Sequence, residues 1–260
     1  MGDHIRYSRV GNIGTITIDR PEKKNAMTFA VLGDFIAAVH EASTDDAIGV
    51  LIVTGVPGSF CAGTDLADLS TIPGEQRGLR GTAEETDKWW PLVSCTKPTI
   101  CAIDGPAVGM GAEFTSQCDL RLASPRAKFA WNFVHRGLVP DTGAGTWLLP
   151  RIIGLQNALR LTYTGDMIDA TEALRLGYLL DVVESADLLD RAHELAARVA
   201  AGSPHSHRLI KQLTYEGLTA SVGEHMVRHT TAMAASFKSD DHREGVAAFL
   251  ERRPARFTGK

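Results

Sequence analysis

The chain has 260 residues, of which 44% are apolar and 22% charged, and its formal net charge is −4 at pH 7. This length allows one large domain or two small ones with a sizeable core, while the charge and the lack of a long basic run argue against nucleic-acid binding. No apolar stretch approaches the ~20 residues that cross a bilayer, and the N-terminus has no signal-peptide pattern. We therefore expect a cytoplasmic protein with no membrane or nucleic-acid partner.

In chain order, the first 150 residues alternate between strand and helix patterns. The pattern predicts an amphipathic helix over residues 25–44 and strands over residues 13–19, 48–55, 99–105 and 119–124. The last three strands are continuous apolar runs, which are typical of a parallel sheet covered on both faces. Residues 70–85, rich in glycine and charge, are expected to form a long loop of functional importance.

Helical periodicity dominates from about Leu155 onward, with one short strand predicted over residues 179–183. The sequence thus predicts an α/β first part followed by a helical lobe. Four cysteines without CxxC spacing indicate small buried residues rather than disulfides or a metal site. His225 and His229 lie four residues apart on a predicted helix, but no third ligand accompanies them, so no metal site is expected.

Two glycine-containing turns are each expected to lead from a strand into a helix: GSFCAGTDLADL (58–69) and AIDGPAVGMGAEF (102–114). Gly63 and Gly111 remove side chains where a ligand could approach the backbone. The amides that begin a helix are unpaired and point outward. If the two turns lie together, they can direct two N–H groups at one oxygen, which is an oxyanion hole.

Asp141 lies in the segment VHRGLVPDTGAG (134–145), between a proline and a run of small residues. On local grounds it suits a turn or a helix cap. Trp89 and Trp90, further upstream, fit core packing or the wall of an apolar pocket equally well.

Both glycine turns, together with the segments AKFAWNFVHRGLVPDTGAGTWLLPRIIG, TGDMIDATEALRLGYLLDVV and DDHREGVAAFLERR, resemble the crotonase, or enoyl-CoA hydratase/isomerase, superfamily. The resemblance runs from about Ile13 to Arg253. It implies an α/β fold of the crotonase type. In this fold, residues 1–195 would form a spiral of ββα units that carries an acyl-CoA site. It further implies a helical region over residues 196–260 for assembly into a homotrimer or a hexamer. Coenzyme A would be part of the substrate, with no metal or other cofactor.

The resemblance also implies roles for individual residues. The backbone amides of Thr64 and Met110 match the two oxyanion donors, and Glu113 matches the first catalytic glutamate of the hydratases. The acyl pocket is expected to include Trp89, Trp90 and Phe133. Residues expected to contact coenzyme A are Lys23 or Lys24, Ala62, Asp65 and Leu66 within one chain, with Phe249 and Arg252 reaching from a neighbouring subunit.

The sequence departs from the hydratase pattern twenty positions after Glu113, where hydratases carry a second glutamate and this chain has Phe133. Asp141 falls where isomerases and a dehalogenase of the superfamily keep an acid. This favours double-bond isomerisation, with Asp141 as the main acid/base and Glu113 as either its partner or a supporting acid. The alternatives are hydration by Glu113 and Asp141, dehalogenase-like attack of Asp141 on an aryl-CoA, and a non-catalytic acyl-CoA-binding protein.

Overall fold

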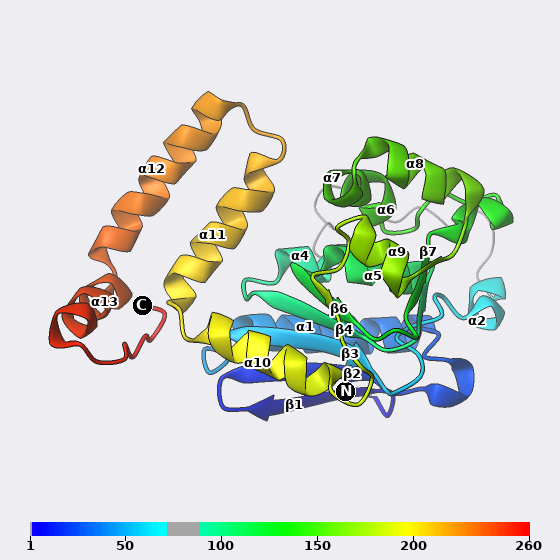
Figure 1. Cartoon of the computed structure of the whole chain (residues 1–260), viewed down its shortest axis with the longest axis horizontal. Helices are drawn as coiled ribbons and strands as arrows, with labels where there is room; N and C mark the ends of the chain where they lie inside the picture. Colours follow the sequence, from blue (N-terminus) through cyan, green and yellow to red (C-terminus); the bar gives the residue numbers. More distant parts are fainter. Residues whose placement is uncertain (1, 72–88) are drawn as a thin grey trace.

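The computed structural model describes residues 2–71 and 89–260 of the chain. Within these residues, a larger sheet has the strand order β1-β2-β3-β4-β6-β9 and a smaller one the order β5-β7-β8 (Figure 1). The strands of the larger sheet are β1 (Ile5–Val10), β2 (Ile13–Ile18), β3 (Val50–Gly55), β4 (Thr99–Ile103), β6 (Leu120–Ala123) and β9 (Asp181–Val182). Those of the smaller sheet are β5 (Pro106–Val108), β7 (Lys128–Ala130) and β8 (Ile168–Asp169).

The larger sheet is parallel from β2 to β9, as its continuous apolar runs predicted, because both of its faces are covered. One face packs against α1 (Phe29–Thr44) and α5 (Met110–Gln117), and the other against α10 (Leu188–Ala200). β1 is an antiparallel edge strand that the sequence did not reveal. Its residues are mostly exposed, so they lack the apolar run on which the prediction depended.

The predicted helix over residues 25–44 begins four residues later than expected. Thr28 is its N-cap, and the Thr28 hydroxyl accepts a hydrogen bond from the Val31 amide. Asn25 instead takes a left-handed backbone with φ +57°. Its fully buried side chain accepts from the Arg20 amide and donates to the Ser59 carbonyl, which ties two segments together. These bonds outweigh helix formation at this position.

The smaller sheet positions the N-terminus of α5. The second glycine turn was expected to lead directly into a helix, but β5 forms within it before α5 begins. β7 leads into the 3-10 helix η4 (Asn132–Arg136). Short helices follow and cover this end of the molecule: α6 (Ala144–Trp147), α7 (Leu149–Ile153), α8 (Leu155–Thr164) and α9 (Ala170–Arg175) (Figure 1). The other short segments of the first part are η1 (Pro21–Lys23), α2 (Leu66–Ser70) and α4 (Pro91–Ser94).

Three C-terminal helices form a lobe that stands apart from the sheets: α11 (Pro204–Gly217), α12 (Val222–Lys238) and α13 (Asp240–Glu251) (Figure 1). The predicted boundary between the two regions, at residues 195 and 196, falls within helix α10, which packs on the larger sheet. The division into two regions stays a prediction. All four cysteines are buried with free thiols. No helix among the described residues has the length and apolar character needed to span a membrane.

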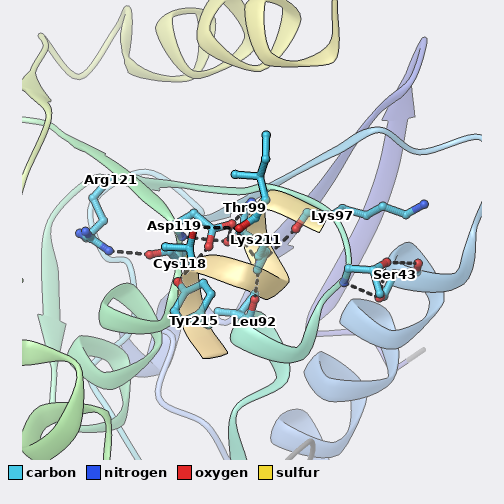
Figure 2. A network of polar contacts seen from close by, with 12 residues as sticks. Ser43, Leu92, Lys97, Thr99, Cys118, Asp119, Arg121, Lys211 and Tyr215 are labelled. Carbon is cyan, nitrogen blue, oxygen red and sulfur yellow. Dashed lines mark hydrogen bonds and ion pairs between the residues drawn. The ribbon is translucent and has the colours of Figure 1, made fainter. Parts of the chain in front are cut away.

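A buried polar network fastens α11 to the sheet (Figure 2). The Lys211 ammonium lies 2.9 Å from Asp119 Oδ2 and donates to the carbonyls of Leu92 and Lys97 at 2.9 and 3.2 Å. The Tyr215 hydroxyl donates to Asp119 Oδ1 at 2.9 Å. Because the Lys211 side chain is buried, these partners take the place of the water that would surround an exposed ammonium group.

Candidate active site

The two glycine turns predicted from the sequence lie against each other. Parallel bridges join Met27 to Thr64 and Cys61 to Ala107, which fixes the first turn between β5 and the segment just before α1. Gly63 has φ +100°, and a Cβ at this position would lie 2.9 Å from the Val108 carbonyl oxygen and 3.7 Å from the Met110 amide nitrogen. Gly63 therefore allows the close approach of the turns that any side chain would prevent.

Two backbone amides are left available where the turns meet. The Met27 amide donates to the Gly63 carbonyl and the Asp65 amide to the Met27 carbonyl, so the Thr64 amide between them points the other way. Met110 opens α5, where a helix leaves its amides unpaired. Neither the Thr64 nor the Met110 amide donates to an acceptor in the described part of the chain. The structure thus brings together the two donors expected from the sequence.

Glu113 lies one turn into α5 and is fully buried. Its Oε2 accepts a hydrogen bond from the Thr142 hydroxyl at 2.8 Å, whereas Oε1 makes no hydrogen bond of regular geometry to any described residue. Burial raises the pKa of Glu113 to about 8, and the nearby charge of Asp141 adds to this increase. The Thr142 hydroxyl, and the amides of Gly145 and Ala144 nearby, act in the opposite direction. Glu113 is consequently a neutral carboxylic acid at neutral pH.

Asp141 differs from Glu113 in its access to solvent. Its side chain is exposed, although protein atoms around it desolvate the carboxyl and raise its pKa to about 6. Asp141 is not a helix cap, because α6 begins after Gly143. Its charge raises the pKa values of both Glu113 and Cys61, and it interacts with the Thr64 side chain. Asp141 therefore lies beside the first turn and near Glu113.

Thr142 connects these groups and was not singled out from the sequence. Its hydroxyl donates to Glu113 and accepts from the Gln117 side chain at 3.3 Å, and its carbonyl accepts from the Trp90 indole at 2.7 Å. Gln117 also donates to the Trp89 carbonyl at 2.9 Å. A threonine between an aspartate and a glycine carries no sequence signal of such contacts, because they come from segments about 25 and 52 residues away.

Gly145 is a second positioning residue that sequence analysis missed. A Cβ there would lie 2.5 Å from Glu113 Oε1 and 2.9 Å from Cδ1 of the fully buried Trp131. Its backbone does not need a positive φ, so only the lack of space demands glycine.

The residues predicted to wall an acyl pocket lie close to these groups. The Trp90 ring packs edge-on against Trp147, with centroids 5.3 Å apart, and Phe133 is buried with its ring tip 3.8 Å from where a Cβ of Gly109 would be. Phe133 thus stands beside the second turn. Nearly all of the predicted loop 70–85 lies outside the described residues.

The residues predicted to contact coenzyme A within one chain gather beside the first turn. The Ala62 amide donates to the Lys24 carbonyl, and Lys23, Lys24 and Leu66 are exposed. Asp65 is the N-cap of α2. The Arg20 guanidinium donates to Asp65 at 2.8 Å and holds its pKa below its usual value. Arg20 was not identified as a site residue from the sequence. Its sequence signal was no more than a positive charge just after a strand.

This geometry agrees with comparisons to known proteins. The family model described as Enoyl-CoA hydratase/isomerase matches residues 8–260. This chain belongs to the enoyl-CoA hydratase/isomerase family. It is 33% identical over 260 residues to a probable enoyl-CoA hydratase from Rhodobacter capsulatus, covering 98% of each chain. It is 35% identical over 250 residues to the 1,2-epoxyphenylacetyl-CoA isomerase of Escherichia coli, covering 95% of each.

The structure of this enoyl-CoA hydratase/isomerase family member also matches solved structures. It aligns with an enoyl-CoA hydratase from Bacillus anthracis at a TM-score of 0.91 and 27% identity, covering 99% of this chain and 100% of the other. The crotonase-like fold expected from the resemblance is therefore confirmed. Most of the similar proteins carry hydratase names, so the family is established more firmly than the reaction.

Within one chain, Phe249 and Arg252 do not lie with the other predicted site residues. Both lie at the end of α13, in the lobe that stands apart from the sheets (Figure 1). The Phe249 side chain is 83% exposed. Their predicted contact with a neighbouring subunit stays a prediction.

Proposed function

We propose that this family member is an enoyl-CoA isomerase that moves a carbon–carbon double bond within an acyl-CoA thioester. The observation that carries the proposal is the contrast between two neighbouring carboxyl groups. Asp141 is accessible to a ligand, whereas Glu113 is fully buried. Isomerisation needs one accessible carboxylate that removes a proton from one carbon and returns it to another. Hydration by two carboxylates needs both of them to reach the same water.

The thioester oxygen would lie between the amides of Thr64 and Met110. Proton removal next to a thioester places negative charge on this oxygen, and each preorganised donor stabilises such charge by about 3–4 kcal/mol. Asp141 takes the proton to give a dienolate with its charge on the oxygen. The same carboxyl group then delivers the proton at the other end of the conjugated system. The product is a shifted double bond, with no net gain or loss of atoms.

Glu113 assists this step by remaining neutral. Its pKa of about 8 and the pKa of about 6 of Asp141 leave a single proton on the pair at neutral pH. A neutral Glu113 adds no negative charge near the dienolate. Asp141 meanwhile is charged and ready to act as the base.

The remaining contacts of the substrate follow the geometry of the first turn. We propose that the CoA portion lies against Ala62, Asp65 and Leu66, with Lys23 or Lys24 near a phosphate and the acyl chain against Trp89, Trp90 and Phe133. Phe249 and Arg252 would complete the site from a neighbour in a trimer or hexamer. Coenzyme A enters as part of the substrate, and the proposed chemistry uses no further cofactor.

Hydration is the second candidate, because hydratase names predominate among the relatives. It would require Glu113 to move toward solvent, since Phe133 supplies no carboxylate. A panel of trans-2-, cis-3- and 3,5-dienoyl-CoA substrates of graded chain length separates the candidates. We expect double-bond migration in the 3-enoyl or dienoyl substrates to exceed hydration of the trans-2 substrates. Faster hydration throughout would favour the hydratase, and binding without turnover would indicate a binding protein.

A further inference from the structure

Thr142 occupies the point where the two carboxyl groups and the wall of the predicted acyl pocket meet. It follows Asp141 directly in the chain, and its buried hydroxyl donates to Glu113 Oε2 at 2.8 Å. The hydroxyl lone pair accepts from Gln117 Nε2 at 3.3 Å, which leaves its hydrogen directed at Glu113. The Thr142 hydroxyl therefore has a defined orientation within the site.

The Thr142 backbone is fixed as well. Its carbonyl accepts from the Trp90 indole at 2.7 Å, and Gln117, which orients its hydroxyl, also donates to the Trp89 carbonyl at 2.9 Å. The two tryptophans are thus linked to Thr142 through both its main chain and its side chain. A shift of this aromatic wall would be transmitted to Thr142, and through it to Asp141 and Glu113.

Resting on the proposed function, we propose that Thr142 is a positioning residue for proton transfer. It holds Glu113 in its buried place beside Asp141 and ties both carboxyl groups to the Trp89–Trp90 wall. Only one Glu113 oxygen is held by this bond, and Oε1 faces Gly145 and Trp131 without a regular hydrogen bond. Among the described residues, the bond from Thr142 is therefore the side-chain hydrogen bond that favours the charged form of Glu113, against the larger effects of burial and of the Asp141 charge.

The Gly145 and Ala144 amides also favour the charged form of Glu113, but Thr142 is the described residue whose side chain donates to it. Helices α4 and α6 and strand β5 pack on α5, and their sequences PLVS, AGTW and PAV carry no ionisable side chain. Helix α1 contacts α5 through the rings of Phe35 and Phe114, whose centroids are 4.9 Å apart. Cys61 lies beside Gly111, and burial raises the pKa of its thiol to about 12, so the thiol stays neutral.

The hydroxyl of Tyr178 forms hydrogen bonds with Thr115 and Ser116, and burial raises the pKa of Tyr178, so this group also stays neutral. Arg121 donates to carbonyls at the far end of α5. In the part of the chain that the structure describes, Asp141 is the charged group that raises the pKa of Glu113.

The test is a Thr142→Val variant, which keeps the shape of the side chain and removes the hydroxyl. A hydroxyl that donates to a carboxylate favours its charged form, so losing it raises the pKa of Glu113. We expect the alkaline limb of kcat/KM to move up by roughly one pH unit, as expected for a lost hydrogen bond to a charged group. Thr142→Ser restores the hydroxyl and should return the limb to its original place.

A matched control is Thr146→Val, four residues along the same segment. The Thr146 side chain is exposed, and among the described residues its hydroxyl donates only to the Gly143 carbonyl, so its loss should leave the limb in place. Because the Thr142 hydroxyl also accepts from the Ala144 amide, a purely structural role predicts a lower Tm with an unchanged limb. That result would overturn the proposal.

Direct titration of Glu113 makes the result independent of turnover. Carbon-13 NMR of glutamate-labelled protein, with Glu113→Gln identifying the resonance, reports the pKa of Glu113 without any substrate. A higher pKa in Thr142→Val supports the positioning role even if the substrate panel rejects isomerisation. An unchanged pKa refutes it even if Asp141 is confirmed as the acid/base. The two proposals can therefore fail separately.

Discussion

At the scale of single residues, the site consists of two carboxyl groups whose surroundings differ. Glu113 is fully buried beneath the N-terminus of α5, and Asp141 is exposed beside the first turn. Desolvation is the largest cause of the raised pKa in both groups, and the negative charge of Asp141 adds to it at Glu113. Different burial of two adjacent acids is a general way to obtain one base and one acid at the same pH.

The first prediction is a bell-shaped dependence of kcat/KM on pH. Activity should rise as pH increases through about 6, where Asp141 loses its proton, and fall through about 8, where Glu113 becomes charged. Steady-state rates from pH 5 to roughly 10 would measure both limbs. Glu113→Gln should abolish the alkaline limb, and its persistence in that variant would assign the limb to another group.

The second prediction concerns stability. The pKa of Glu113 is about 8 in the folded protein and near its ordinary 4.5 when unfolded, so the folded state binds more protons between these values. Stability should therefore fall as pH rises across this window, by about 1.4 kcal/mol per pH unit from this group alone. Urea unfolding at several pH values should show a smaller decline for Glu113→Gln. An equal decline in both proteins would show that Glu113 ionises normally.

At the scale of elements, the site depends on how closely α5 packs against its neighbours. Gly111 at the start of α5 allows the Cys61 carbonyl to approach, since a Cβ would lie 2.2 Å from its oxygen. Gly145 in α6 leaves room for Glu113 in the same way. These glycines are required by contacts between elements rather than by the conformation of their own backbone.

A Gly145→Ala variant tests this packing. The added methyl group would collide with Glu113 Oε1 and Trp131, so Glu113 must move. We expect a Tm lower by several degrees and kcat reduced at least tenfold, with a smaller change in KM. Gly33→Ala is the matched control, because an added Cβ on this exposed position of α1 meets no atom within 4 Å. It should keep full activity and leave the Tm equal or higher. Full activity in Gly145→Ala would mean that the position of Glu113 is unimportant.

The same elements show what the sequence could predict. Continuous apolar runs correctly indicated β3, β4 and β6, because strands covered on both faces consist mainly of apolar residues. β5 and β7 were missed, since three residues are too few to establish a period. Glycine spacing and family resemblance pointed to the turns, Glu113 and Asp141. Thr142, Arg20 and Gly145 could not be found, because their roles depend on contacts between distant segments.

At the scale of the whole molecule, the C-terminal lobe exposes many apolar side chains. Val222, Val227, Phe249 and Leu250 are each between 69% and 83% exposed on α12 and α13. Surface of this kind usually marks an interface. The lobe is fastened to the sheet by Lys211 and Asp119, and Lys211 also donates to the Leu92 carbonyl in α4 (Figure 2). Trp90 is the N-cap residue of this helix. Assembly and substrate binding are thus expected to be linked.

The prediction at this scale is that the chain forms a trimer or hexamer and that Arg252 contributes to its CoA site. Arg252→Gln keeps a non-glycine residue at a left-handed backbone position, with φ +56°, so little new strain is introduced. KM should increase several-fold with little change in kcat, because a phosphate contact serves ground and transition states alike. Analytical ultracentrifugation checks the assembly. A monomer with an unchanged KM in Arg252→Gln would contradict both parts.

The central claim is that Asp141 moves the proton in double-bond isomerisation, and its most direct test is the turnover of a 3-enoyl-CoA by Asp141→Asn. Asparagine keeps the size of the side chain and removes its basicity. We predict that kcat falls by roughly 10²–10⁴, the usual contribution of a positioned general acid–base. Binding of the CoA thioester, measured by calorimetry, should remain close to that of the parent protein. Isomerisation at the parental rate in Asp141→Asn would contradict the account.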